Sequence, residues 1–242
     1  MKIIVIIPTY NEKENINQII DAVLSQHEAL EILIVDDNSP DGTADMVKIL
    51  QEKSPKIHLH QRAGKLGLGS AYREGYVIAL QKGADYIVQM DADFSHNPKY
   101  LLDMIELKES ADVIVGSRYI KGISVLNWPL RRILLSYFAN QYAKVITGVK
   151  VEDLTAGFKF ISRSALEKID LSEVKSNGYG FQIEMNYAFH TTGSSIAETP
   201  ILFMDREHGV SKMNKEIILE ALLGVWAFRM KSYKKVKYKF DN

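Results

Sequence analysis

The chain of 242 residues contains no cysteine, which excludes disulfides and thiolate metal sites. Its 30 Lys and Arg residues balance 30 Asp and Glu residues. No global field therefore draws the protein to nucleic acid, and we expect no nucleic-acid partner. No apolar run reaches the roughly 18–20 residues that a membrane span needs, and the stretch at residues 3–7 is too short for a signal peptide. These absences fit a protein of a reducing compartment.

The chain also has no internal repeat, low-complexity block or Pro/Gly-rich linker. With 46% hydrophobic and 25% charged residues, it has the composition of a globular protein that buries a core without covalent staples. We expect one main domain over residues 1–212, followed by an amphipathic helix and a basic tail over residues 213–242.

Apolar strands alternate with amphipathic helices in the first half of the chain. The pattern predicts strands at residues 3–7, 31–35, 56–60, 85–90 and 112–116, and helices at residues 16–24, after 41–43, and at 68–80. Strands that are apolar throughout and alternate with helices indicate an α/β fold with a mainly parallel sheet and helices on both faces. After residue 120 the pattern predicts strands at 158–162 and 196–203 and helices at 130–146 and 217–230.

The fourth predicted strand leads directly into Asp91-Ala92-Asp93. Ligands of open α/β sheets bind at the carboxyl ends of the strands. Mg²⁺ is typically held by one or two carboxylates and completed by phosphates and water. An isolated pair of this kind also occurs in ordinary solvated loops, so the other motifs of the chain must indicate whether it binds a cation.

Polar residues also follow the first two strands, as Pro8-Thr9-Tyr10-Asn11-Glu12 and as a segment that begins Asp36-Asp37. Tyr10 suits stacking on a base or ribose, while Glu12 and Asp37 suit hydrogen bonds from base N–H groups or ribose hydroxyls. Taken singly, residues 11–14 read as a helix start and residues 41–43 as a cap and turn.

The glycine-rich segment 64–69 does not match a phosphate-binding loop, because Leu66 stands where Ser or Thr is required and the third glycine of a dinucleotide turn is missing. We expect a tight loop there, from which Lys65 can reach an anion.

Three of these motifs, at residues 8–12, 35–43 and 91–93, together resemble family 2 glycosyltransferases with the GT-A nucleotide-diphospho-sugar transferase fold. Gly116-Ser117-Arg118-Tyr119, Asp153-Leu154-Thr155-Ala156-Gly157-Phe158 and the segment 206–212 continue the resemblance. Within the family, the set is most similar to the dolichyl- or polyprenyl-phosphate mannosyltransferases. The match runs from residue 2 to about 213, so residues 1–212 would be the catalytic domain.

The resemblance implies a role for each matched position. A GDP-mannose guanosine would be surrounded by Pro8, Tyr10, Glu12, Val35 and Asp37. The diphosphate and a divalent cation, Mg²⁺ or Mn²⁺, would lie against Asp91, Ala92 and Asp93, with Ser95 as a further metal ligand. Arg118 would face the sugar phosphate, and Arg206 and Lys212 would close on the diphosphate. Asp91, Asp93, Arg118 and Arg206 are the expected catalytic residues.

The expected chemistry is an inverting transfer of mannose to a dolichyl or polyprenyl phosphate. GDP leaves readily only when its growing negative charge is neutralised, which a cation at the acidic pair and the basic residues would achieve. The acceptor is a phosphate monoester that is already anionic, so it needs alignment more than a strong base. Arg118, Arg131 and Arg132 are candidates for steering its phosphate. For Arg131 and Arg132 a solvated helix face is an equal alternative.

A lipid-linked acceptor requires the protein to meet a membrane surface. The predicted helix at residues 130–146 and the basic tail at residues 229–239 suit reversible docking at the cytoplasmic face. Alternatively, this helix packs on the domain or forms a dimer contact. For the helix at 217–230, membrane docking and such packing are equal alternatives. Many relatives carry transmembrane helices or depend on membrane-spanning partners. The resemblance therefore adds a separate membrane subunit as a candidate partner.

Other interpretations stay open at this point. A related enzyme would use a UDP-sugar with a lipid phosphate, and a silent module would bind a nucleotide sugar without turnover. A nucleotidyltransferase would want a basic loop that residues 8–12 do not supply. His58 and His60 share a strand face without a third histidine, which favours packing over a metal site. His208 is a candidate for polar positioning near the diphosphate.

Overall fold

The computed structural model describes residues 1–178, 180–204, 224–231 and 233. The predicted site residues Arg206 and Lys212 and the neighbouring His208 lie outside the described residues. So do the proposed domain boundary after residue 212, the first part of the predicted helix at 217–230 and most of the basic tail.

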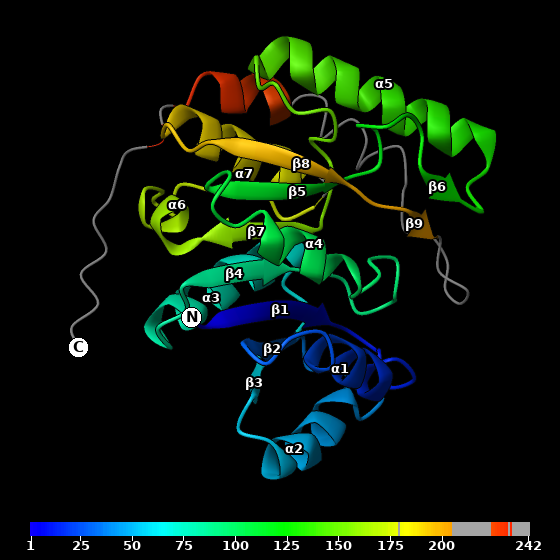
Figure 1. Ribbon diagram of the computed structural model, residues 1–242, viewed down its shortest axis with the longest axis vertical. Coiled ribbons are helices and arrows are strands. Elements are labelled where there is room, and N and C mark those ends of the chain that lie inside the picture. Colours follow the sequence, from blue (N-terminus) through cyan, green and yellow to red (C-terminus); the bar gives the residue numbers. More distant parts are fainter. Residues whose placement is uncertain (179, 205–223, 232, 234–242) are drawn as a thin grey trace.

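A seven-stranded sheet forms the centre of the molecule, in the order β3-β2-β1-β4-β7-β5-β8, which runs from bottom to top in Figure 1. All its neighbouring strands are parallel except β7, which is antiparallel to both β4 and β5. The strands are β1 (Ile3–Thr9), β2 (Leu30–Asp36), β3 (Ile57–Gln61), β4 (Tyr86–Gln89), β5 (Val113–Ser117), β7 (Lys159–Ser162) and β8 (Ile196–Pro200). The inner strands are almost wholly buried, as the sequence predicts, whereas the edge strands β3 and β8 are mostly half-buried.

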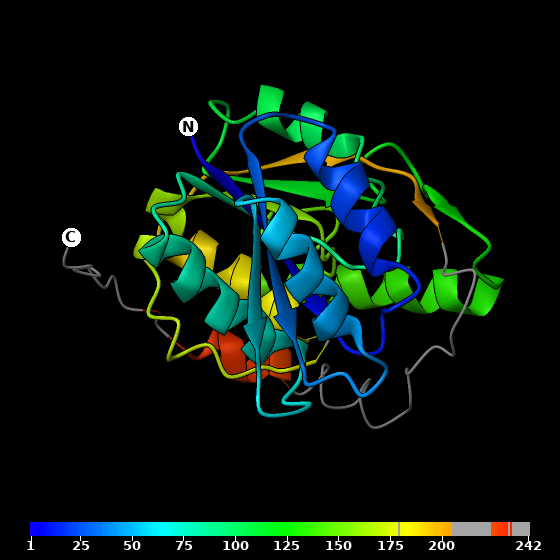
Figure 2. The same cartoon turned by 90° about the horizontal axis from the view of Figure 1, so that it is seen from below.

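Helices cover both faces of this sheet. They are α1 (Ile16–Leu24), α2 (Thr43–Lys53), α3 (Leu68–Gln81), α4 (Tyr100–Glu106), α5 (Leu130–Thr147), α6 (Arg163–Glu167) and α7 (Gly180–Thr191). Buried residues of α1, α2 and α4 form one core with the sheet, and those of α3, α5, α6 and α7 form the other. In Figure 2, α1 and α3 lie on opposite sides of the near strands, and α4 and α7 lie on opposite sides of the far strands. The prediction of a mainly parallel sheet covered on both faces is therefore confirmed.

The predicted strand at residues 196–203 is wrong in its extent. Strand β8 ends at Pro200, which is paired with Ser117, the last residue of its neighbour β5. The chain then leaves the sheet, and β9 (Phe203–Met204) pairs instead with β6 (Val125–Leu126) in a separate two-stranded sheet. Beyond Ser117 the neighbouring chain is no longer a strand, so β8 has no partner along which to continue.

The C-terminal part of the described chain packs on the core that contains α3, α5, α6 and α7. Residues 224–229 are helical, and Val225 and Phe228 are buried against the core that contains α7. Tyr233 is buried there as well, and its hydroxyl donates a 2.6 Å hydrogen bond to Glu184 in α7. The described part of the predicted helix at 217–230 therefore packs on the domain, which is one of the two alternatives for it. Trp226 and Met230 on the same segment are exposed.

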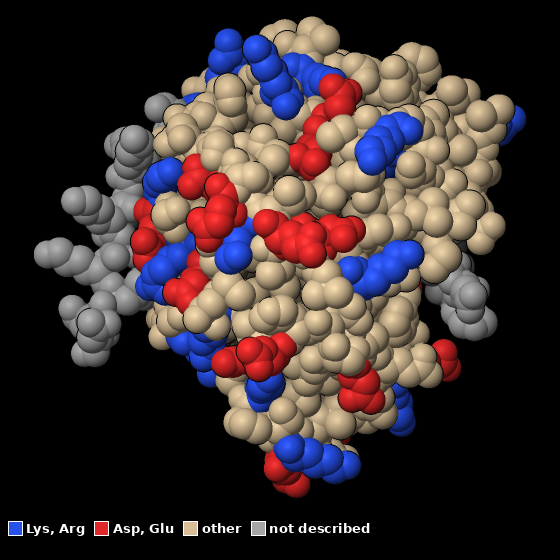
Figure 3. All heavy atoms as spheres, in the orientation of Figure 1, with Lys and Arg blue, Asp and Glu red and all other residues tan. Residues whose placement is uncertain are grey.

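Helix α5 has an unusual burial pattern for a surface helix. Its second half packs inward through Asn140, Ala143 and Thr147, whereas Leu130, Leu134 and Phe138 are 69%, 46% and 63% exposed. In Figure 3 the surface at the upper right, where α5 begins in Figure 1, carries few charged side chains. Within the described ranges, no helix combines the length and apolarity needed to cross a membrane.

Candidate active site

The carboxyl ends of β1, β2 and β4 lie side by side, because these three strands are parallel neighbours. The hydroxyl of Thr9 donates to Asp36 at 2.8 Å, and the backbone N–H of Asp37 donates to the carbonyl of Thr9 at 3.0 Å. Asp36 also accepts hydrogen bonds from the backbone and the hydroxyl of Ser39. The structure therefore joins two polar segments that lie nearly 30 residues apart in the sequence.

Tyr10 and Glu12, two of the predicted nucleoside contacts, lie in the loop that follows β1 at this edge. The ammonium of Lys65 lies 4.3 Å above the ring of Tyr10, so the glycine-rich segment does approach the predicted base region. Glu12 accepts a 2.9 Å hydrogen bond from the side chain of Asn15 and, through its carbonyl, begins α1. Residues 11–14 thus also serve as a helix start, as the alternative interpretation predicts.

Pro8 and Val35, two further predicted nucleoside contacts, are paired neighbours in the sheet. Val35 is wholly buried and packs in the core with α3, whereas Pro8 is half-buried. At residues 41–43, the carboxylate of Asp41 accepts hydrogen bonds from the backbone and hydroxyl of Thr43. This confirms the predicted turn before α2.

Asp37 has a partner that the sequence reasoning missed. The buried guanidinium of Arg62 pairs with the Asp37 carboxylate at 2.5 Å and with Glu74 at 3.1 Å. Glu74 in turn contacts His60 at 3.0 Å. The signal was present in the sequence, because Arg62 directly follows β3 and so belongs to the same carboxyl edge as the other polar segments.

The acidic pair follows β4, as predicted. The Asp91 side chain is about one-third exposed and Asp93 is also partly exposed, whereas Ala92 and Ser95 are buried. The backbone N–H of Ser95 donates to the Asp93 carboxylate at 3.1 Å. Burial, together with the nearby charge of Asp91, raises the pKa of the Tyr72 phenol well above its usual value. Tyr72 is therefore neutral, and its hydroxyl donates a 3.3 Å hydrogen bond to the carbonyl of Met90, the residue before the pair.

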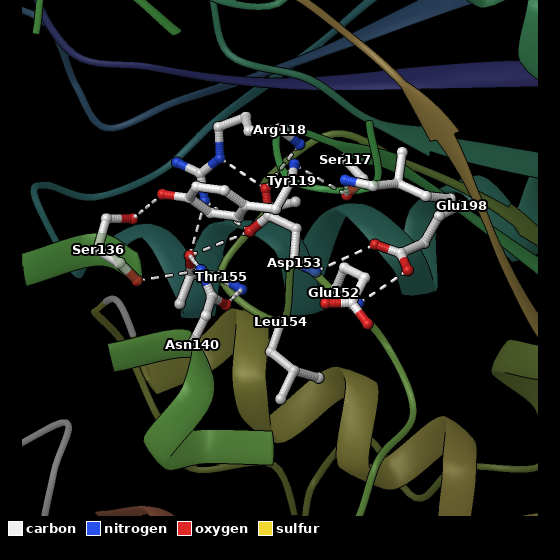
Figure 4. A network of polar contacts seen from close by, with 12 residues as sticks. Ser117, Arg118, Tyr119, Ser136, Asn140, Glu152, Asp153, Leu154, Thr155 and Glu198 are labelled. Atoms are coloured by element: carbon white, nitrogen blue, oxygen red, sulfur yellow. Dashed lines mark hydrogen bonds and ion pairs between the residues drawn. The ribbon is translucent and has the colours of Figure 1, made fainter. Parts of the chain in front are cut away.

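Arg118 lies in a buried polar network (Figure 4). Its guanidinium donates two hydrogen bonds of 2.6 Å to the two carboxylate oxygens of Asp153 and one of 2.7 Å to Thr155. Burial alone would raise the pKa of Asp153, but the Arg118 guanidinium holds it below its usual range. Asn140 of α5 accepts a bond from the Thr155 backbone, so the network ties α5 to the end of β5. A substrate contact by Arg118 stays a prediction.

Lys159 is a second buried cation that sequence reasoning missed. It is the first residue of β7, opposite Gln89 of β4, and is wholly buried. Its amine donates hydrogen bonds to the carbonyl of Ala156 and to the side chain of Gln182 in α7. Burial lowers the pKa of Lys159 from 10.5 to about 7, although Asp153 and Asp91 oppose the change. No local pattern marks this residue, because a single lysine in a strand usually faces solvent.

The remaining predicted cations and histidines are placed as follows. Arg131 is exposed at the start of α5, and the guanidinium of Arg132 lies 4.0 Å from the ring centre of Trp128. His58 contacts Glu31 at 2.7 Å, so His58 and His60 each pair with a carboxylate, which supports the packing interpretation. Across the described residues, no three His, Cys, Asp or Glu side chains are grouped to hold a metal ion.

A mainly parallel sheet with acidic and aromatic side chains gathered at its carboxyl edge is the arrangement of nucleotide-dependent α/β enzymes. The chain belongs to Glycosyl transferase family 2, whose sequence profile matches residues 4–170. The resemblance stated from the sequence is thereby confirmed.

Two relatives extend the match over nearly the whole chain. Polyprenol monophosphomannose synthase of Mycolicibacterium smegmatis is 44% identical over 230 residues, which cover 93% of this chain and 87% of the relative. Undecaprenyl-phosphate mannosyltransferase of Micrococcus luteus is 38% identical over 225 residues, which cover 93% of both chains.

The fold is shared with solved glycosyltransferases. Glucosyl-3-phosphoglycerate synthase of Mycobacterium tuberculosis, crystallised with phosphoglyceric acid, superposes with a TM-score of 0.65 at 17% identity. The alignment covers 94% of this chain and 79% of that one. Another structure of that enzyme, with Mn²⁺, UDP-glucose and phosphoglyceric acid, gives a TM-score of 0.64. The predicted GT-A fold class is confirmed.

Proposed function

We propose that this protein is an inverting glycosyltransferase that moves mannose from GDP-mannose to a polyprenyl phosphate. The observation that carries the proposal is the acidic pair after β4, at the sheet edge where β1 and β2 also end, in a chain 44% identical to a polyprenol monophosphomannose synthase. The relative from Micrococcus luteus, named for undecaprenyl phosphate, supports the same class of acceptor.

The residues at this edge fit a divalent cation. Asp91 and Asp93 offer hard carboxylate oxygens with partial exposure to solvent, and Mg²⁺ and Mn²⁺ ordinarily add phosphate and water oxygens to such a pair. The buried hydroxyl of Ser95 is the third proposed ligand. When bound there, the cation would neutralise charge on the departing diphosphate. The related fold crystallised with Mn²⁺ and UDP-glucose supports a cation of this class.

The donor nucleoside would lie between the loop after β1 and the segment after β2. Tyr10 beneath Lys65 supplies an aromatic face with a cation, and Asp37 is held in place by Arg62. A fixed carboxylate gives a base or ribose hydroxyl a defined acceptor, which is how buried polar groups produce specificity. Arg206 and Lys212 remain proposed contacts to the diphosphate.

The acceptor phosphate would approach from the side of α5. Arg131 is exposed at the first turn of this helix, and the Arg118–Asp153 network positions the same helix relative to β5. A guanidinium near the incoming phosphate would align it for attack, and an anionic monoester needs no strong base.

The exposed apolar side chains of α5 support docking at the cytoplasmic face of a membrane. Leu130, Leu134 and Phe138 follow one another at helical spacing on a surface beside Arg131. An amphipathic helix of this kind lies in the interface with its apolar side buried and its basic residues near anionic headgroups. A separate membrane subunit that completes the enzyme belongs to the same proposal.

The division into a catalytic domain at residues 1–212 and an appendage at 213–242 is also a proposal. The buried contacts of Val225, Phe228 and Tyr233 with the core of α7 support an appendage that packs closely on the domain.

The experiment that tests the proposal incubates purified protein with labelled GDP-mannose and short polyprenyl phosphates, with and without a chelator. We expect mannosyl lipid that disappears with chelator and returns with excess Mg²⁺ or Mn²⁺. Parallel reactions with UDP-glucose and UDP-amino sugars test the donor, and a preference for any UDP-sugar would overturn the mannose assignment. Asp93→Asn should bind nucleotide without turnover; equal turnover would remove Asp93 from the mechanism.

A further inference from the structure

A buried histidine lies directly beneath the acidic pair. His96 is 2% exposed, and its Nδ1 accepts a 3.2 Å hydrogen bond from the backbone N–H of Asp91. The same nitrogen is 3.6 Å from Asp91 Oδ2, which is beyond hydrogen-bond distance. The histidine therefore holds the main chain of Asp91 rather than its carboxylate, and the accepting role of Nδ1 places the ring proton on Nε2.

The turn that His96 holds is strained. Phe94 has a φ of 60°, in the left-handed region that costs a non-glycine residue roughly 1–2 kcal/mol. A backbone in such a region persists only when surrounding contacts fix it. Two contacts do so here: the N–H of Ser95 bonds to the Asp93 carboxylate at 3.1 Å, and the N–H of Asp91 bonds to His96.

The imidazole ring is itself confined on three sides. It stacks on Phe158 with ring centres 5.1 Å apart and meets the edge of Phe203 at 5.5 Å. On the third side lies Gly157, where an added Cβ would stand 3.2 Å from His96 Cε1. A larger residue at position 157 would displace the ring.

A second layer fixes the segment that carries Gly157. Lys159 donates to the carbonyl of Ala156, the residue before this glycine, and to Gln182 of α7. Contacts therefore run without a break from α7 through Lys159 and residues 156–157 to His96, and from His96 to the main chain of Asp91.

We propose that His96 is a positioning residue of the metal site: by pinning the strained turn at residues 91–96, it keeps the carboxylates of Asp91 and Asp93 in the geometry that binds the cation and the donor diphosphate. The inference rests on the proposed metal-dependent transfer. Residues that orient metal ligands typically change metal affinity 10–100-fold when they are lost, because the ligands must then be ordered at the moment of binding.

The test compares two substitutions of similar size. In His96→Leu the acceptor is lost, whereas in His96→Asn the side-chain Oδ1 stands close to the place of Nδ1 and can accept the same bond. Mn²⁺ binding is measured by the electron paramagnetic resonance signal of free Mn²⁺, with the protein saturated in GDP. We expect His96→Leu to weaken Mn²⁺ binding about 10–100-fold and His96→Asn to recover most of the loss. Excess Mn²⁺ should restore much of the transfer activity of His96→Leu.

Gly157→Ala provides a second route if His96→Leu does not fold, because its Cβ pushes the ring from the other side. It should weaken Mn²⁺ binding as well, while Gly178→Ala, which has open space around its Cβ, should bind Mn²⁺ as the unchanged protein does. A folded His96→Leu or Gly157→Ala protein that binds Mn²⁺ normally would overturn the inference. If the unchanged protein binds no Mn²⁺, or if Asp93→Asn binds it equally well, the proposed metal site fails instead.

Discussion

The buried amine of Lys159 predicts an unusual dependence of stability on pH. Its two acceptors, the Ala156 carbonyl and the Gln182 side chain, match the two N–H bonds of a neutral amine. A protonated amine would carry a third N–H into the core. This is consistent with burial lowering the pKa of Lys159 from 10.5 to about 7 in the folded protein. The charged groups that act on the pKa of Lys159 are Asp153, Arg118 and Asp91.

The sign follows from proton linkage. Between pH 7 and 10.5 the unfolded chain holds a proton on Lys159 that the folded protein has lost, so the free energy of unfolding rises with pH across this window. Below pH 7 both states are protonated and the contribution is constant at its lowest value. Each pH unit is worth about 1.4 kcal/mol, so from pH 7 to 9.5 the contribution rises by roughly 3 kcal/mol.

Urea denaturation of the unchanged protein and of Lys159→Met, at pH 6, 7, 8 and 9.5, measures this contribution. Methionine keeps the apolar stem without the amine, and all other titrating groups are common to both proteins. The difference in unfolding free energy should be flat between pH 6 and 7 and then move in favour of the unchanged protein by roughly 3 kcal/mol up to pH 9.5. A difference that stays constant over the whole range would refute a pKa near 7 for Lys159.

Three further substitutions test other parts of the structure. Asp153→Asn should lower the free energy of unfolding by about 3–5 kcal/mol, because it removes the carboxylate charge that pairs with the buried Arg118 guanidinium; an unchanged urea midpoint would contradict this. Gly69→Ala places a Cβ 2.2 Å from a backbone oxygen, so it should lower the melting temperature by several degrees, whereas Gly178→Ala should not. Phe138→Ser changes a side chain that is 63% exposed, and should reduce cosedimentation with anionic vesicles while leaving the melting temperature unchanged. Equal vesicle binding would argue against α5 as the docking helix.

The central strands could be predicted because their signal is local. Strands β1, β2 and β4 are apolar on both faces, which is the pattern of a parallel sheet under two helical layers. The polar residues that follow them must then meet at one edge, since parallel strands share a direction. The positions of Asp37 and of the acidic pair followed from this rule alone.

Helix α7 was not predicted, and its surroundings explain why. Every residue from Phe181 to Phe189 is buried, including Gln182, Glu184 and Asn186. A helix enclosed on all sides has no solvent face, so it lacks the alternation of apolar and polar residues by which a surface helix is recognised. Some polar groups in it have distant partners: Glu184 accepts from Tyr233, and the Asn186 side-chain N–H donates to the Leu154 carbonyl.

The sequence by itself determined the family, the order of the strands along the chain and the edge at which the acidic pair lies, because apolar periodicity and short motifs depend only on neighbouring residues. The tertiary structure decided the partners: Arg62 for Asp37, Asp153 for Arg118, and His96 beneath Asp91. The first two pairings join residues 25 and 35 positions apart, and a charge is buried only where folding brings a partner to it. The physical reason is that desolvation and pairing depend on distance in space, which no local pattern records.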